Sequence, residues 1–196
     1  MTAALPTNSA VAEPSRFWIL TATTGRFDLA NPRGEAFEPA ALARQLSQIS
    51  AWNGNTQFLY SVAQRAVLVA STITDPGARI YGLLNSAPAI VLGDMQLGAK
   101  DYLIADGTDT MALERRTLAA VWKQFGLRPP TAEIAGAVDI AHARVLATEY
   151  RDVVLGKDPL WTPPGQTLSR VIKFRKRIDV ELEFLDALEH YSRAAS

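Results

Sequence analysis

Few residues in this chain could carry out chemistry, and their spacing narrows the choice. The chain has two histidines, His142 and His190, far apart in sequence, and no cysteine. This excludes thiolate metal sites, disulfides and cysteine nucleophiles, and it supports no zinc motif. Ser86 lies in the stretch LLNSAPAIVLGDM but has neither a G-x-S-x-G elbow nor an evident Ser-His-acid order. We therefore expect no serine catalysis, a hydrogen-bonded His142 in the core and an exposed His190.

Charge is balanced over the whole chain but is clustered near its end. The 20 basic and 20 acidic side chains cancel, which argues against a general nucleic-acid or membrane-surface binder. A basic cluster precedes an acidic one: Arg170, Lys173, Arg175, Lys176 and Arg177, then Asp179, Glu181, Glu183, Asp186 and Glu189. This order favours ion pairs four residues apart and suits an antiparallel partner helix. We predict a protein partner or self-association.

The bulk sequence is typical of one globular domain. At 48% hydrophobic residues, a chain of 196 can bury a sizeable core. No apolar run approaches the roughly 18 residues of a membrane span, and the N-terminus lacks the pattern of a signal peptide. We expect a cytoplasmic protein with no membrane contact. It would have a flexible tail at 1–16, a helical core at 17–156, and a Pro-rich connector with a C-terminal helix at 157–196.

The elements that position these residues are mostly helices. The region 17–37 predicts one or two short strands or an extended arm. Apolar residues then have helical spacing in three segments: one that starts at Pro39, one over 58–73, and one from Asp75-Pro76 to about Leu92. A loop is expected over 93–109.

The second half of the chain predicts more helices. An amphipathic helix is expected over 110–125, another from Thr131 to Tyr150, and a long one over 168–194 whose apolar stripe includes Ile178 and Leu182. The fold class is therefore mostly α, with five to seven helices in one domain.

Five stretches occur in a particular order along the chain. They are TGRFDLANPR, ALARQLSQISAWNGNTQFLYSVAQRAVLVAS, LLNSAPAIVLGDM, ALERRTLAAVWKQFGL and AHARVLATEYRD, and they cover about Thr24 to Asp152. Together they resemble the HD-domain phosphohydrolases, in the bacterial and phage branch related to 5′-deoxynucleotidases. The resemblance implies a single HD-domain-like helical bundle with a short extended or β N-terminal segment. It also points to nucleotide hydrolysis and to a phage or prophage origin.

The same resemblance locates a metal site whose residues are changed here. The family holds a divalent metal with two histidines and two aspartates. By position, the first histidine corresponds to Arg65, the His-Asp doublet to Asn85 and Ser86, and the last aspartate to His142. Arginine cannot coordinate a metal, Asn85 and Ser86 offer only neutral oxygens, and a lone imidazole does not make a site. The resemblance therefore implies a degenerate metal site.

Arg65 leaves two alternatives open. In one, its guanidinium takes the place of the metal, and a pocket of Gln57, Arg65, Asp94 and Glu149 binds an anion such as a nucleotide phosphate. In the other, Arg65 pairs internally with Asp94 or Glu149 and the pocket is filled. A buried arginine needs a partner in either case. We favour internal pairing.

These observations together predict a pseudoenzyme. We expect a catalytically inactive HD-fold protein, without a cofactor, that serves as a binding, regulatory or structural module. Its partner would be a protein or a nucleotide held without hydrolysis. The alternative is a phosphohydrolase acting on deoxynucleotides through a site rebuilt from Asp94, Glu149 and His142 around manganese, cobalt or magnesium.

Overall fold

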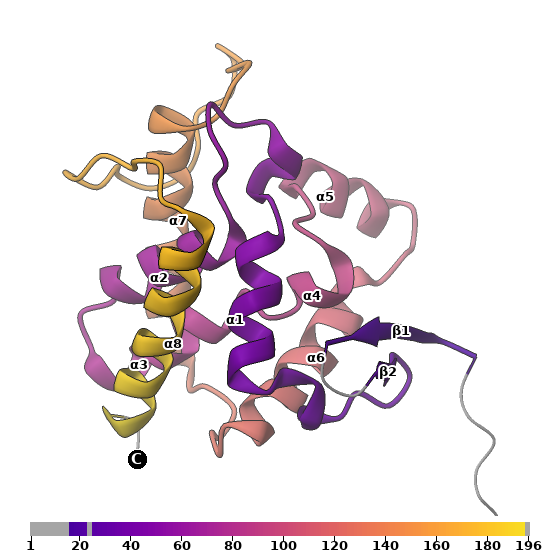
Figure 1. Ribbon diagram of the computed structural model, residues 1–196. Coiled ribbons are helices and arrows are strands. Elements are labelled where there is room, and N and C mark those ends of the chain that lie inside the picture. Colours follow the sequence, from indigo (N-terminus) through magenta and orange to yellow (C-terminus); the bar gives the residue numbers. More distant parts are fainter. Residues whose placement is uncertain (1–15, 23–24, 195–196) are drawn as a thin grey trace, which may run out of the picture.

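The protein is mostly α-helical, with a small antiparallel sheet near its N-terminus (Figure 1). The computed structural model describes residues 16–22 and 25–194, so the predicted tail at 1–16 lies outside the described residues except for Arg16. The elements are β1 (Trp18–Thr21), β2 (Gly25–Asp28), η1 (Gly34–Phe37), α1 (Pro39–Gln48), η2 (Ala51–Gly54), α2 (Val62–Thr72), α3 (Pro76–Leu84), α4 (Ala89–Leu92), α5 (Leu97–Ala105), α6 (Thr110–Gln124), α7 (Ala132–Asp152) and α8 (Arg177–Ala194). The predicted fold class is confirmed at the level of helical content and the N-terminal β segment.

Most helices begin where the sequence provides a cap. The side chains of Ser61, Asp75, Asp109 and Thr131 each accept a hydrogen bond from a backbone N–H in the first turn of α2, α3, α6 and α7. Such caps satisfy donors that have no partner inside the helix. These side chains therefore set the first residues of the helices that carry the site.

One core joins the two ends of the chain. It contains Phe27 and Phe37, whose rings meet edge to face with centroids 5.4 Å apart, together with residues of α1, α2 and α3. Val180, Phe184 and Leu188 of α8 belong to the same core. In Figure 1, α8 runs beside α1 across α2 and α3. The C-terminal helix thus packs on the domain itself.

The predicted helix from Asp75 to Leu92 is broken in the middle. Helix α3 ends at Leu84, and α4 begins at Ala89. Pro88 has no N–H to donate, and its ring would clash with the carbonyl of Leu84 in a continuous helix. The turn that results contains Asn85 and Ser86.

The prediction of a loop over 93–109 is wrong, because α5 occupies Leu97–Ala105. Its apolar residues do not form one face: Leu97, Tyr102 and Ile104 are all exposed, and no α5 residue is fully buried. Without helical periodicity, the sequence could not indicate this helix.

The prediction of a helix over 168–194 is also wrong for its first part. α8 begins only at Arg177. Before it, the backbone N–H of Leu168 donates to Thr148 Oγ1 and that of Ile172 to Asp152 Oδ2, both at 2.9 Å. Arg151 donates to the carbonyl oxygens of Leu168 and Arg170. These tertiary contacts hold residues 168–176 off the helical path.

The apolar face of α8 also differs from the predicted stripe. Ile178 and Leu182 are 49% and 55% exposed, whereas Val180 and Phe184 are buried. Arg177 pairs with Glu181 at 2.5 Å, as the charge order predicted. Among the described residues, no helix is both long and apolar enough to cross a membrane.

Candidate functional site: a closed ring of charged and hydrogen-bonding groups

Arg65 lies at the centre of the site, on α2. Its Nε donates to Glu149 Oε1 at 2.8 Å, and its Nη1 donates to Asp94 Oδ1. Glu149 comes from the last turns of α7, and Asp94 lies between α4 and α5. The prediction that Arg65 pairs with Asp94 or Glu149 is confirmed, and both carboxylates take part.

Trp52 closes the arrangement into a ring. Its backbone N–H donates to Asp94 Oδ2 at 2.6 Å, and its indole Nε1–H donates to Glu149 Oε2 at 2.9 Å. All four oxygens of the two carboxylates therefore accept a hydrogen bond within the ring. We call this set the Arg65 ring: Trp52, Arg65, Asp94 and Glu149.

The backbone near Trp52 is unusual. Trp52 and Asn53 have φ angles of 56° and 51°, a left-handed conformation that costs free energy for a residue with a side chain. The bond from the Trp52 N–H to Asp94 helps to hold this turn, and Gln96 Nε2 donates to the Trp52 carbonyl at 3.3 Å. Asp94 therefore binds both Arg65 and the turn that carries Trp52.

The Arg65 ring is largely shielded from solvent. The side chains of Arg65 and Asp94 are 15% and 13% exposed, and that of Glu149 is 1% exposed. Burial lowers the pKa of Arg65, but the charges of Glu149 and Asp94 outweigh it and raise that pKa above its ordinary value. Burial, followed by the charge of Glu149, raises the pKa of the neighbouring Tyr60 hydroxyl well above 10. Arg65 is thus a permanent cation and Tyr60 a neutral phenol.

A second pair lies beside the ring. Asn85 Nδ2 is 3.0 Å from His142 Nε2. An amide nitrogen only donates, so Nε2 is the acceptor and the proton of the neutral ring is on Nδ1. Burial, and then the positive charges of Arg65 and Lys100, lower the pKa of His142 to about 4. His142 is therefore neutral at pH 7, in a hydrogen-bonded position, as predicted.

The remaining predicted site residues do not join the ring. Gln57 is exposed, and its backbone N–H donates to Val153 O at 2.8 Å. Ser86 lies in the turn between α3 and α4, where its carbonyl accepts from Ala89 N at 3.1 Å. The predicted pocket of Gln57, Arg65, Asp94 and Glu149 therefore comes together only in its last three members.

Sequence reasoning missed two groups beside the site. Tyr60 immediately precedes the cap of α2 and is fully buried, but its place in the sequence does not indicate that it lies near Arg65. Lys100 pairs with Glu114 at 2.5 Å, which joins α5 to α6. No sequence signal indicated this pair, because α5 itself was predicted to be a loop.

The donors that could hold a metal are already engaged. Asp94 and Glu149 bind Arg65 and Trp52, and His142 accepts from Asn85. Within residues 16–22 and 25–194, no group of three His, Asp or Glu side chains is arranged to hold a metal ion. What this geometry does is neutralise two buried carboxylates with a guanidinium and anchor the turn at Trp52.

Comparison with known proteins finds a relative that covers most of the chain. No protein-family model matches the chain. An uncharacterized protein of Rhodobacter capsulatus is 30% identical over 189 residues, covering 90% of this chain and 95% of that protein. The chain belongs to the same family.

Proposed function

We propose that this chain is a catalytically inactive protein with an HD-like helical fold, and that it acts as a binding, regulatory or structural module. The proposal rests on one observation: every carboxylate oxygen of Asp94 and Glu149 is bonded within the Arg65 ring. Metal-assisted hydrolysis needs carboxylate or imidazole lone pairs directed at the metal. Here those lone pairs are directed at a guanidinium and at the two N–H groups of Trp52.

The net charge of the Arg65 ring also determines which ligands it could bind. Arg65 carries one positive charge, and Asp94 and Glu149 carry one negative charge each, so the ring has a net charge of −1. An anion such as a nucleotide phosphate would have to compete with both carboxylates for Arg65. We infer that Arg65 is a structural cation, and that ligands or partners bind elsewhere on the molecule.

The test is metal content together with hydrolysis. Purified protein is subjected to elemental analysis and then assayed with deoxynucleoside monophosphates in the presence of manganese, cobalt or magnesium. We expect no stoichiometric metal and no turnover. One bound equivalent with turnover would overturn the proposal in favour of the alternative, a phosphohydrolase rebuilt around Asp94, Glu149 and His142.

A second test asks whether the positions that correspond to the metal ligands of the HD-domain phosphohydrolases can be converted into a metal site. The variant combines Arg65→His, Asn85→His, Ser86→Asp and His142→Asp, and the control omits only Ser86→Asp. If the correspondence is right, manganese at about 100 times its Kd raises the stability of the fourfold variant by about 2.7 kcal/mol. The control should respond less, and wild type should not respond. Equal behaviour of all three proteins would contradict the assignment of these positions.

The anion-binding alternative has its own test. Nucleoside monophosphates should leave the melting temperature of wild type unchanged, because Arg65 is already paired. A rise in wild type that disappears in Arg65→Lys, which keeps the charge but loses the fork geometry, would instead support a nucleotide-binding pocket.

A further inference from the structure

The outward face of α8 combines apolar and charged side chains in an unusual order. Phe174, Ile178 and Leu182 are 55%, 49% and 55% exposed. Ile178 and Leu182 are four residues apart and therefore lie on the same side of the helix. The opposite side, with Val180 and Phe184, is buried against the domain. Ile178 and Leu182 thus lie side by side in solvent, and Phe174 precedes α8 with its ring edge to face against Phe58.

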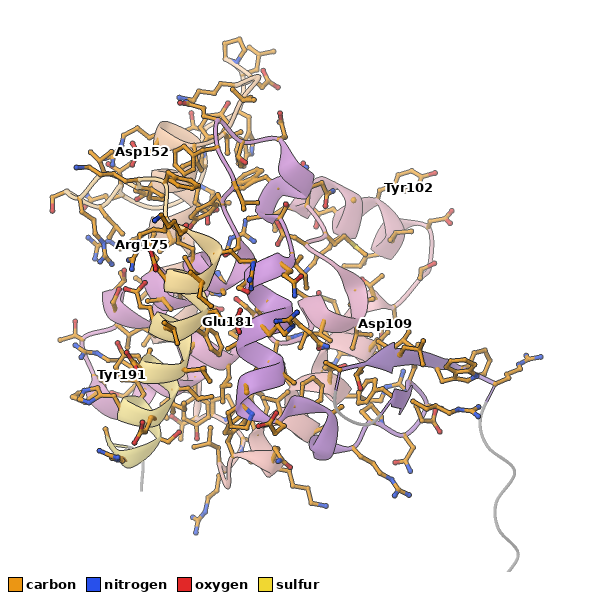
Figure 2. All side chains as sticks on the ribbon, in the orientation of Figure 1. Tyr102, Asp109, Asp152, Arg175, Glu181 and Tyr191 are labelled. Atoms are coloured by element: carbon orange, nitrogen blue, oxygen red, sulfur yellow. The ribbon has the colours of Figure 1, made fainter. Side chains whose placement is uncertain are left out.

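Charges of opposite sign flank this apolar patch. Lys173 and Lys176 precede Ile178, Asp179 lies between Ile178 and Leu182, and Asp186 follows Leu182; all four are exposed. Within the described part of the chain, none of these four side chains forms an ion pair. In Figure 2, the labels of Arg175, just before α8, and of Glu181 and Tyr191 within it show the course of this helix. Among these four side chains, the positive ones therefore lie at the N-terminal end of the patch, and the negative ones lie within it and beyond its C-terminal end.

This order is complementary to itself. If two copies of α8 cross in an antiparallel sense, the basic end of each lies against the acidic end of the other, and the apolar centres meet. The chain as a whole has no net charge, so no long-range repulsion opposes the approach of a second copy. A partner of a single charge sign would match only one end of the patch.

We infer that the outward face of α8 is a docking surface for a second copy of this chain, in a two-fold antiparallel dimer. Ile178 of one protomer packs near Leu182 of its partner, and Lys176 lies close to Asp186 across the interface. The inference rests on the binding role proposed above and adds to it a surface and a partner. It does not depend on the Arg65 ring.

The first experiment measures the oligomeric state by sedimentation velocity as a function of concentration. We expect a monomer–dimer equilibrium for the full chain. Leu182→Glu, which buries a charge in the contact, should abolish the dimer. Leu160→Glu is the matched control, because Leu160 is 94% exposed and lies outside α8. A monomer at all concentrations, or equal effects of the two variants, would overturn the inference.

Charge reversal tests the antiparallel pairing. Lys176→Glu or Asp186→Lys alone should weaken the dimer about tenfold, since the two-fold axis counts each pair twice. The two changes together should restore wild-type affinity. Neither side chain has a described ion pair within its own chain, so the melting temperature of the monomer should hardly change. If the double variant dimerises more weakly than either single variant, the pairing of Lys176 with Asp186 is contradicted.

The absence of cysteine permits a direct test of orientation. Single variants Ile178→Cys and Leu182→Cys are oxidised alone and as an equimolar mixture. An antiparallel dimer cross-links best between the two different variants in the mixture. Preferential cross-linking of each variant with itself would refute the antiparallel arrangement. Failure in these three experiments would leave the proposed absence of catalysis untouched, because only bound metal and turnover decide that.

Discussion

Replacing Arg65 by methionine is the strongest single test of how the ring is held together. Arg65→Met keeps a long, flexible side chain on α2 but removes the positive charge and both donors. Asp94 and Glu149 then share a confined space without a counter-charge, and each loses one of its hydrogen bonds. The free energy of unfolding should fall, because the cost of keeping both carboxylates out of water is no longer offset.

The size of the effect follows from the burial of the partners. Breaking a buried ion pair by removing one member costs about 3 to 5 kcal/mol. Arg65 and Asp94 retain 15% and 13% exposure, so we expect the lower end, about 3 kcal/mol. For a chain of this length that corresponds to a decrease in melting temperature of about 6 to 12 °C.

The assay is urea unfolding at pH 7, followed by circular dichroism, with Arg115→Met as the control. Arg115 pairs with Asp109 at 3.2 Å, but its side chain is 63% exposed, so the control should lose less than about 0.5 kcal/mol. A third protein adds Asp94→Asn and Glu149→Gln to Arg65→Met. These changes keep acceptors for Trp52 while removing the unpaired charges, so stability should partly recover. If Arg65→Met costs no more than Arg115→Met, the ring does not stabilise the fold.

Three further predictions concern single residues. The pKa of His142 is about 4 in the fold against about 6.5 unfolded. The contribution of His142 to the free energy of unfolding is therefore fully present above pH 6.5, and it falls by up to about 3 kcal/mol toward pH 4 because the unfolded chain binds the proton first. In acid-unfolding curves, His142→Gln should remove this loss, and His190→Gln should not. Gly165→Ala should destabilise by more than about 1 kcal/mol in urea unfolding, since its φ is +91° and the new Cβ would lie 2.8 Å from a backbone carbon. Gly156→Ala, with open space around it, should cost less. Trp52→Phe should cost about 1 to 2 kcal/mol on thermal unfolding by leaving Glu149 Oε2 without its donor.

Local signals in the sequence were enough for most of the helices. Asp75-Pro76, Thr131 and the periodic pattern after Thr110 each combine a cap or start residue with apolar spacing, and the corresponding helices are present. The internal pairing of Arg65 was also predictable, because a guanidinium at a site rich in carboxylates must find a counter-charge when it is buried.

The failures share a physical cause: tertiary contacts that no local pattern reports. The segment 168–176 has the apolar and charged composition of a helix start, yet Thr148 and Asp152 on α7 bind its backbone. The part played by Trp52 depends on a left-handed turn whose partner, Asp94, is 42 residues away. The exposure of Ile178 and Leu182 was missed because α8 has apolar residues on more than one side, and only its packing on the domain selects the side of Val180 and Phe184 as the buried one.

The packing of α8 on α1 also bears on how the chain folds. The Ser47 hydroxyl donates to Glu181, which is 134 positions further along the chain, and Leu46 lies in the same core as Phe184. Closing so long a segment costs chain entropy before any contact compensates for it, which slows folding. Once formed, the two helices protect each other. Amide hydrogens of α1 and α8 should therefore exchange with a common free energy of opening, as one cooperative unit built from distant parts of the sequence.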